Sequence, residues 1–79
     1  MFFVYVLQSE KGNKRYIGFT DNLERRLQEH TNGKVKSTKN RRPLKLVYLE
    51  EYDSKIETMN REKFLKSGFG RSFLKKIEK

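Results

Sequence analysis

The sequence predicts an α+β fold in which helices flank a small, largely antiparallel, three-stranded sheet, in the order β-β-α-β-α-α. Three segments rich in Phe, Val, Tyr, Ile and Leu have the length and composition of strands, and three others carry apolar residues at helical spacing. Three strands cannot bury an apolar surface by themselves, so the helices must cover the sheet. The 79 residues leave room for one small core, which predicts a single domain spanning residues 1–79.

The first two strands are predicted over residues 2–8 and 14–19, paired as a β-hairpin. The connection contains Gly12 and Asn13, two residue types that tolerate the positive φ of tight hairpin turns. Gly18 interrupts the second strand, and glycine within a strand usually marks a bulge or the close approach of another group.

Residues 44–52 are predicted to form the third strand. Leu44, Leu46 and Tyr48 lie on one face of it, whereas Val47 and Leu49 lie on the other. Apolar residues on both faces predict that the middle of this strand is covered on both sides.

Three helices are predicted from their caps and their apolar spacing. The first begins near Asp21, whose spacing from Glu24 resembles a capping box, and it ends at Gly33, a typical left-handed residue after a helix. The other two are predicted over about residues 55–66 and 71–77.

The chain carries 19 Lys and Arg against 10 Asp and Glu, a formal net charge of +9. The basic residues are spread over loops and helices, which favours a nucleic-acid backbone over a lipid surface as the partner. Residues 34–43 contain five positive charges and no acid. These five are the predicted nucleic-acid contacts: Lys34, Lys36, Lys39, Arg41 and Arg42. The alternative is a solvated loop with charged tips.

Cysteine is absent, which excludes disulfides, a cysteine-ligated zinc site and a thiol nucleophile, and fits a reducing compartment. The apolar start, residues 1–7, is too short for a signal peptide or a membrane span. We therefore expect a cytoplasmic protein with no membrane partner.

Polar residues on apolar helix faces are the candidate functional groups. Leu23 and Leu27 define the buried side of the first helix, and helical spacing places Arg26 and His30 on that same side. Arg26 could extend along the sheet edge while His30 forms hydrogen bonds in the core, or both could face a cleft.

Glu62 falls inside the apolar arc of the second helix, where a carboxylate is costly unless it is paired or bound to a metal. A salt bridge to Lys66, Arg61 or Arg26 would satisfy it. Alternatively it could ligate Mg²⁺, which proteins commonly hold through one or two carboxylates together with water and substrate phosphate.

Tyr5 and Tyr16 lie on the two hairpin strands, where a tyrosine is more often a packing residue than a catalyst. Together with Arg26, His30 and Glu62, they define one predicted cleft beside the basic loop.

The hairpin residues resemble those of the GIY-YIG endonuclease domain family, and in particular its short stand-alone members. Tyr16-Ile17-Gly18 matches the second half of the family motif. Phe3-Val4-Tyr5 stands where Gly-Ile-Tyr would be, and it keeps only the tyrosine.

The two longer helices extend the resemblance over nearly the whole chain. Residues 22–30 are similar to the family helix that carries an arginine and a histidine, here Arg26 and His30. Residues 60–63 match the segment with the metal-binding glutamate, here Glu62.

The resemblance implies a nuclease that hydrolyses a phosphodiester bond with one divalent metal, Mg²⁺ or Mn²⁺. It implies that Glu62 holds the metal and that Arg26 braces the phosphate. Tyr5 or Tyr16 would orient the attacking water and help to deprotonate it, and His30 would relay a proton or hold a tyrosine in place.

We therefore predict an endonuclease acting on DNA, with RNA left open, that prefers branched, nicked or distorted substrates and serves repair or recombination. Low intrinsic sequence specificity is expected unless a partner protein or a dimer supplies it. The alternative is a nucleic-acid-binding module that keeps the fold without turnover. A third hypothesis is a small interaction domain whose aromatic residues contact a protein.

Overall fold

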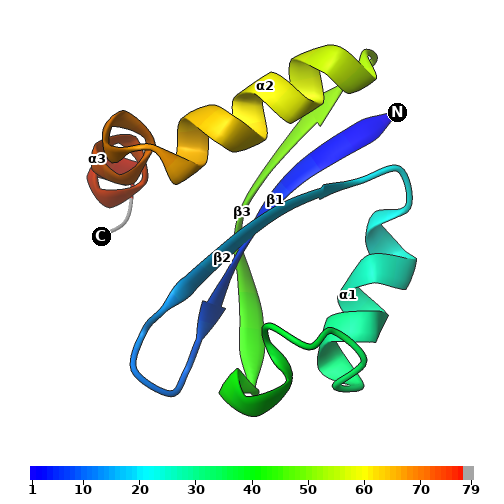
Figure 1. Ribbon diagram of the computed structural model, residues 1–79, viewed down its shortest axis with the longest axis vertical. Helices are drawn as coiled ribbons and strands as arrows, with labels where there is room; N and C mark the ends of the chain where they lie inside the picture. The colour runs from blue at the N-terminus through cyan, green and yellow to red at the C-terminus, as the bar shows by residue number, and fades with distance from the viewer. Residues whose placement is uncertain (78–79) are drawn as a thin grey trace.

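The computed structural model describes residues 1–77. Its elements follow the chain in this order: β1 (Phe2–Ser9), β2 (Arg15–Thr20), α1 (Leu23–Thr31), the short 3₁₀ helix η1 (Lys39–Arg41), β3 (Leu44–Tyr52), α2 (Lys55–Lys66) and α3 (Gly68–Ile77) (Figure 1). The predicted α+β fold with its three strands and three helices is confirmed. The last two residues of the predicted domain lie outside the described ones.

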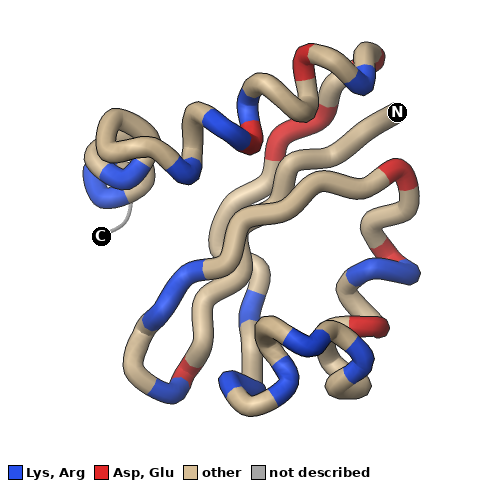
Figure 2. Tube along the Cα trace, viewed as in Figure 1, with Lys and Arg blue, Asp and Glu red and all other residues tan. Residues whose placement is uncertain are grey.

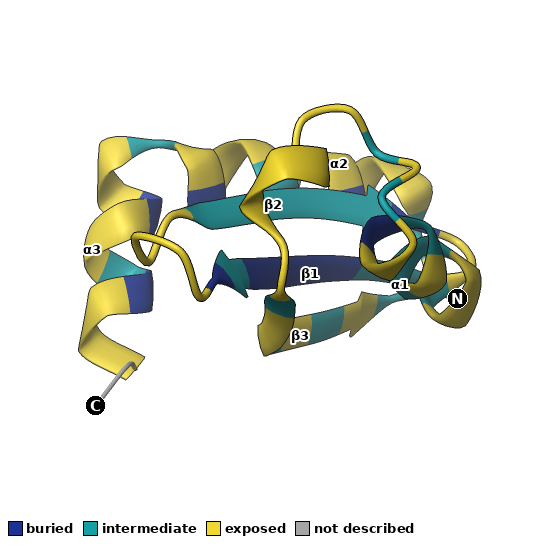
Figure 3. Cartoon of the chain, turned by 90° about the horizontal axis from the view of Figure 1, so that it is seen from below, coloured by how far each residue is buried: buried dark blue, intermediate teal, exposed yellow. Residues whose placement is uncertain are grey.

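The sheet has the order β2-β1-β3, and both strand pairs are antiparallel. The hairpin turn between β1 and β2 places Gly12 at φ 85° and Asn13 at φ 57°, the positive values that the sequence predicted there. The central position of β1 makes it the most buried strand, as Figure 3 shows.

The hydrophobic core lies on one face of the sheet, built around Val4 and Val6 of β1. Leu65 of α2 and Leu74 of α3 pack against these two valines, and all four are buried. Helices α2 and α3 therefore cover this face, while α1 lies on the other side of the sheet (Figure 1).

The prediction that β3 is covered on both sides is wrong. Leu46, Val47 and Leu49 keep 38–39% of their surface exposed. The reason is that β3 is an edge strand, and a register shift opposite Val6 and Leu7 leaves Val47 without a partner in the ladder.

The predicted N-cap of the first helix is one residue early. Asn22, not Asp21, is the N-cap, and its side chain accepts a hydrogen bond of 3.1 Å from the backbone N–H of Arg25. Asp21 instead forms an exposed ion pair with Arg25 at 3.9 Å.

The last helix begins at Gly68, three residues earlier than predicted. Gly70 is helical because α3 packs directly against the end of α2: a Cβ at Gly70 would lie 2.3 Å from the Cα of Leu65. Ser67 caps the new helix by accepting a 3.3 Å hydrogen bond from the N–H of Gly70. Gly70 therefore permits a close contact between two helices, because it has no Cβ.

No helix within residues 1–77 combines the length and the apolar character needed to cross a membrane.

Candidate active site

A pocket of about 860 Å³ lies along the outer edge of β2. Residues from both faces of β2 line it, because the pocket wraps around the edge of the sheet. Its lining includes all five side chains that the sequence assigned to one cleft: Tyr5, Tyr16, Arg26, His30 and Glu62. The structure thus brings these side chains together from β1, β2, α1 and α2, while their chemical roles stay predictions.

Gly18 allows the Tyr5 side chain to reach this edge. The two residues are directly paired across β1 and β2, so both point to the same face of the sheet. A Cβ at Gly18 would lie 2.5 Å from the phenol oxygen of Tyr5. The glycine in the strand therefore marks a close approach, as the sequence suggested, and the group that approaches is the Tyr5 phenol.

A chain of hydrogen bonds fixes the Tyr5 hydroxyl. Arg26 Nε donates to the Tyr5 oxygen at 3.2 Å, and the Tyr5 oxygen lies 3.1 Å from Nε2 of His30. On the far side of the imidazole, Nδ1 lies 2.8 Å from the hydroxyl of Thr38, whose own oxygen lies 3.5 Å from the carbonyl of Val35.

The first bond of this chain has a fixed direction, since a guanidinium is a donor only and the Tyr5 oxygen must accept from Arg26. The direction of the second bond depends on the tautomer of His30, and we assign the phenol proton to the bond with Nε2, which is then the unprotonated ring nitrogen. The ring proton then sits on Nδ1 and is donated to Thr38. In this tautomer His30 is a neutral acceptor for the phenol proton, and the Thr38 hydroxyl can donate in turn to the carbonyl of Val35.

The environment of His30 supports the neutral form. The side chain is buried, and burial together with the nearby positive charge of Arg26 lowers the pKa of His30 below its ordinary value. The hydrogen bonds from Arg26 to Tyr5 and to Glu29 raise the pKa of Arg26 further. His30 is therefore both a hydrogen-bonded buried histidine and a lining residue of the pocket, so the two alternatives that the sequence left open for it are not exclusive.

Tyr16 lies on the same face of the sheet, paired with Leu7 next to the pair formed by Tyr5 and Gly18. Its ring lines the pocket, and the ammonium of Lys14 lies 5.9 Å from the ring centroid. Among the hydrogen bonds found in residues 1–77, His30 bonds to Tyr5 rather than to Tyr16.

Glu62 projects from α2 toward the pocket with 18% of its side chain exposed. Of its three predicted partners, Lys66 is the one it meets, with Nζ 3.4 Å from Oε2. Arg26 pairs instead with Glu29 at 3.0 Å, and Arg61 pairs with Glu50 at 2.8 Å. Glu62 is thus a carboxylate at the pocket wall whose partner is one exposed lysine.

This arrangement fits a hard divalent cation such as Mg²⁺ or Mn²⁺. Glu62 already faces a positive group, the ammonium of Lys66. It is also the only acidic residue among those that line the pocket. Within residues 1–77, no cluster of three or more His, Cys, Asp and Glu side chains is placed to bind a metal. A cation at Glu62 would therefore complete its shell with water and with oxygens of a substrate phosphate, as Mg²⁺ commonly does.

A second polar network holds α2 on the sheet. Glu50 of β3 receives two hydrogen bonds from Arg61 of α2, at 2.8 and 2.9 Å, and one each from Tyr48 and Tyr52. Burial opposes ionisation of Glu50, but these hydrogen bonds outweigh it and hold its pKa below the ordinary value. Burial and the bond to Glu50 raise the pKa of Tyr52 to about 12. The network fixes α2 to the sheet at Arg61, the residue that directly precedes Glu62.

The basic loop contributes to the pocket through other residues than those predicted. Val35, Ser37 and Thr38 line it, whereas the five predicted basic contacts are exposed on the loop and do not. Arg42 also has a structural role, because it donates to the carbonyls of Lys39 at 3.0 Å and of Thr31 at 3.2 Å.

Four residues of the site were not predicted from the sequence, namely Thr38 as the partner of His30 and the lining cations Lys14, Arg15 and Arg71, and Lys66 was predicted only as a partner of Glu62. Two of the lining cations had a signal. Lys14 lies two residues before Tyr16 in the hairpin, and Lys66 lies one helical turn after Glu62. Nothing in the sequence relates Thr38 to His30, because a loop joins them.

The sequence profile described as "GIY-YIG catalytic domain" matches residues 1–77. A UPF0213 protein of Staphylococcus haemolyticus is 44% identical over 77 residues, which cover 96% of this chain and 93% of that protein. A UPF0213 protein of Syntrophus aciditrophicus is 49% identical over 67 residues, which cover 81% of this chain and 75% of that protein. The solution NMR structure of a UPF0213 protein from Bacillus halodurans is similar with a TM-score of 0.60 and 32% identity, over 99% of this chain and 86% of that one.

Proposed function

The chain belongs to the GIY-YIG catalytic domain family, a nuclease family, and from this premise we propose that it is a divalent-cation-dependent endonuclease that hydrolyses DNA phosphodiester bonds. The family match over residues 1–77 confirms the resemblance that the sequence suggested. Membership of this family implies that the substrate is a nucleic acid. The preference for DNA, the cation and the role of each residue are part of the proposal.

One observation carries the proposal: the hydrogen-bonded chain from Arg26 through Tyr5 to His30 shares a pocket with Glu62. A phosphodiester hydrolase needs a group that takes a proton from water and positive charge that stabilises the phosphate. This pocket offers both, because Tyr5 can pass its proton to His30 and Arg26 supplies fixed charge.

In the proposed reaction, a water molecule attacks phosphorus while the bond from phosphorus to the leaving oxygen breaks. The water gives a proton to the Tyr5 oxygen as the phenol proton moves to Nε2 of His30, 3.1 Å away. Arg26 Nε, 3.2 Å from the phenol oxygen, stabilises the negative charge that develops there during the transfer.

Burial and Arg26 lower the pKa of His30, which makes it a weak base in the free protein. A bound phosphodiester brings negative charge beside Arg26 and favours protonation of the imidazole. Substrate binding therefore prepares His30 to accept the proton at the time it is needed.

The two tyrosines have different roles in this proposal. Tyr5 is the proton-transfer group because it contacts His30 and Arg26. Tyr16, which lines the same pocket, would orient the water or the phosphate.

Glu62 would hold the cation, Mg²⁺ or Mn²⁺. When bound, such a cation supplies a positive charge that neutralises the phosphate and stabilises the leaving oxygen.

We further propose that the enzyme acts on branched, nicked or distorted DNA with low sequence specificity, in repair or recombination. The exposed cations of residues 34–43 favour contacts with phosphates, which carry no sequence information. Targeting to particular sites would then require a partner protein or a second copy of the chain.

The test is cleavage of end-labelled branched DNA, duplex DNA and RNA by the purified protein with Mg²⁺ or Mn²⁺. The wild type is expected to cut DNA, and Glu62→Gln is expected to slow cleavage at least ~100-fold because it removes the cation ligand. Glu57→Gln is the matched control, since Glu57 is an exposed acid in the first turn of the same helix.

Cleavage of DNA by Glu62→Gln at the wild-type rate would refute the role of Glu62. A wild type that binds DNA and cuts none of these substrates with either cation would instead indicate a nucleic-acid-binding module without turnover.

A further inference from the structure

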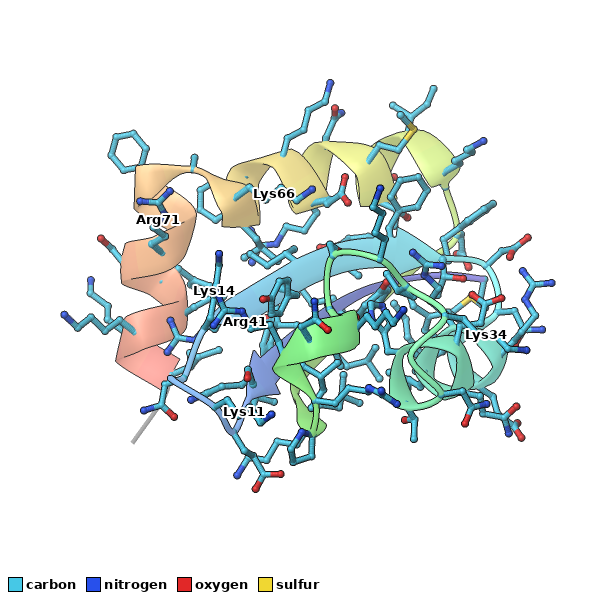
Figure 4. All side chains as sticks on the ribbon, turned by 60° about the horizontal axis from the view of Figure 1, so that its bottom comes forward. Lys11, Lys14, Lys34, Arg41, Lys66 and Arg71 are labelled. Carbon is cyan, nitrogen blue, oxygen red and sulfur yellow. The ribbon has the colours of Figure 1, made fainter. Side chains whose placement is uncertain are left out.

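A second group of cations lines the pocket outside the set of residues assigned to the reaction. Lys14 comes from the end of the hairpin, Lys66 from the last turn of α2 and Arg71 from the first turn of α3 (Figure 4). Counting all lining residues, five are Lys or Arg and one, Glu62, is acidic. The excess of positive charge is therefore a property of the pocket wall and not only of the loop at 34–43.

These side chains are available for a ligand. All three are exposed, and the guanidinium of Arg71 forms no ion pair within residues 1–77. Lys14 lies over the ring of Tyr16, and Lys66 pairs with Glu62 at 3.4 Å with 55% of its side chain exposed. An ion pair this exposed contributes little free energy, so Lys66 can exchange its partner.

The backbone holds the hairpin beside the basic loop. Ser9 is fully buried, and its hydroxyl lies 2.6 Å from the carbonyl of Arg41 and accepts a 3.0 Å bond from the N–H of Lys11. The N–H of Glu10 donates to the carbonyl of Pro43 at 3.0 Å. The hairpin and the end of the loop, which both carry Lys and Arg, are therefore fixed to each other.

The position of Arg71 is fixed by the tight packing of α3 on α2. The absent side chain of Gly70 allows this contact, which places Arg71 one turn beyond Lys66 around the corner between the helices. Figure 2 shows Lys and Arg at the hairpin, in the loop before β3 and where α2 meets α3.

We propose that Lys14, Lys66 and Arg71 form a second phosphate-binding wall, which holds the backbone of the nucleic acid next to the phosphate that is cut. Lys66 pairs with Glu62 in the free protein and moves to a backbone phosphate when a divalent cation takes its place at the carboxylate. This inference extends the proposed function. It depends on that function at one point, because Lys66 leaves Glu62 only if a divalent cation binds there.

The first test measures binding to a labelled DNA duplex in EDTA as a function of salt concentration. Each lost contact with a duplex phosphate lowers the slope of log K against log salt by about 0.9. In EDTA Lys66 stays paired with Glu62, so the triple variant K14Q/K66Q/R71Q is expected to lower the slope by about 2 units, through the loss of Lys14 and Arg71. K14Q alone, a change at an exposed position, is expected to lower it by about 0.9.

The control is K63Q/K75Q/K76Q, which removes three positive charges from exposed positions of α2 and α3 that do not line the pocket. Its slope is expected to fall by less than about 1 unit. Equal slopes for the two triple variants would overturn the proposed wall, because binding would then depend only on the total charge.

The second test measures binding of Mn²⁺ to the DNA-free protein by the electron paramagnetic resonance of the free ion. Removing the competing ammonium in K66Q should tighten Mn²⁺ binding by about two- to fivefold, while K63Q removes the same charge from a position outside the pocket and should change it less. The exchange of Lys66 is overturned if K66Q and K63Q bind Mn²⁺ equally.

Cleavage is not needed for either readout, so this proposal and the nuclease proposal can fail separately. A protein that does not cut DNA but shows the slope difference would keep the wall and lose the nuclease. A protein that cuts DNA but shows equal slopes would keep the nuclease and lose the wall.

Discussion

Tyr5 is the residue on which the proposed chemistry depends, and its position is set by a neighbour without a side chain. Its hydroxyl accepts from Arg26, faces the acceptor nitrogen of His30, and passes over Gly18 on the way. Each of these contacts joins β1 to another element, either α1 or β2. The role of Gly18 is therefore to leave space for the phenol, and a small change there should be felt at the reactive group.

Gly18→Ala should displace the Tyr5 phenol, because the added Cβ would lie 2.5 Å from its oxygen. We expect cleavage to slow by about 100-fold, as a shift of about 1 Å at a reacting group can do. The loss of stability should stay near 1 kcal/mol, since the phenol can move. Single-turnover cleavage and urea unfolding measure the two effects, and wild-type cleavage by this variant would contradict the role of Tyr5.

His30 should make the stability of the protein depend on pH. Burial and Arg26 lower its pKa in the folded state from the ordinary 6.5, so below pH 6.5 the unfolded chain binds a proton that the folded chain does not. The contribution of His30 to the free energy of unfolding should thus be constant above pH 6.5. As the pH falls below 6.5, the free energy of unfolding should decrease by at most about 1.4 kcal/mol per pH unit.

Unfolding in urea at pH 7.5 and 5.5 measures this dependence, with His30→Gln as the comparison. The wild type should lose more free energy of unfolding than the variant over this interval. The lowered pKa of Glu50 acts below its ordinary value of 4.5 and so does not interfere. Equal losses in the two proteins would show that His30 does not titrate as described.

At the scale of elements, the site depends on how α2 sits on the sheet. The bidentate pair of Arg61 with Glu50 joins the helix to β3, and Arg61 also lies over the rings of Phe64 and Phe73 at 4.8 and 5.0 Å. Because Glu62 follows Arg61 directly, this pair sets the rotation of the helix that aims Glu62 at the pocket. The network is thus structural and acts on the site through position.

Arg61→Met should lower the free energy of unfolding by about 1–3 kcal/mol, because Glu50 loses its charged partner in a partly buried site. Lys63→Met, at an exposed position of the same helix, should change it by less than about 0.5 kcal/mol. Urea unfolding measures both. Equal stability of the two variants would show that the Arg61–Glu50 pair does not hold α2 in place.

Sequence patterns predicted which elements form but located their ends less well. The strands of the hairpin and α2 are governed by local composition and turn residues, and the prediction of them is confirmed. The start of α3 depends on backbone contact between Gly70 and Leu65, and the exposure of β3 depends on its place at the sheet edge. Both are tertiary properties that no local pattern records.

At the scale of the whole molecule, the site too was predicted in part from local sequence patterns, while the rest of it depends on tertiary contacts. Polar residues at apolar helix positions identified Arg26, His30 and Glu62, because burying such groups needs a reason. The partners of these residues were beyond the sequence, since Thr38 reaches His30 only when the loop folds back. The net charge of +9 predicted a polyanionic partner, but only the fold shows that part of this charge lines the pocket itself.

The central claim is that Tyr5 and Glu62 act on one phosphate as a single unit, and cleavage by the two single variants and the double variant tests it most directly. Tyr5→Phe and Glu62→Gln should each slow single-turnover cleavage of branched DNA by about 10²–10⁴-fold. Because residues of one catalytic unit are strongly non-additive, the double variant should be little slower than the slower single variant. Effects that multiply in the double variant, or a Tyr5→Phe protein that cuts at the wild-type rate, would contradict the account.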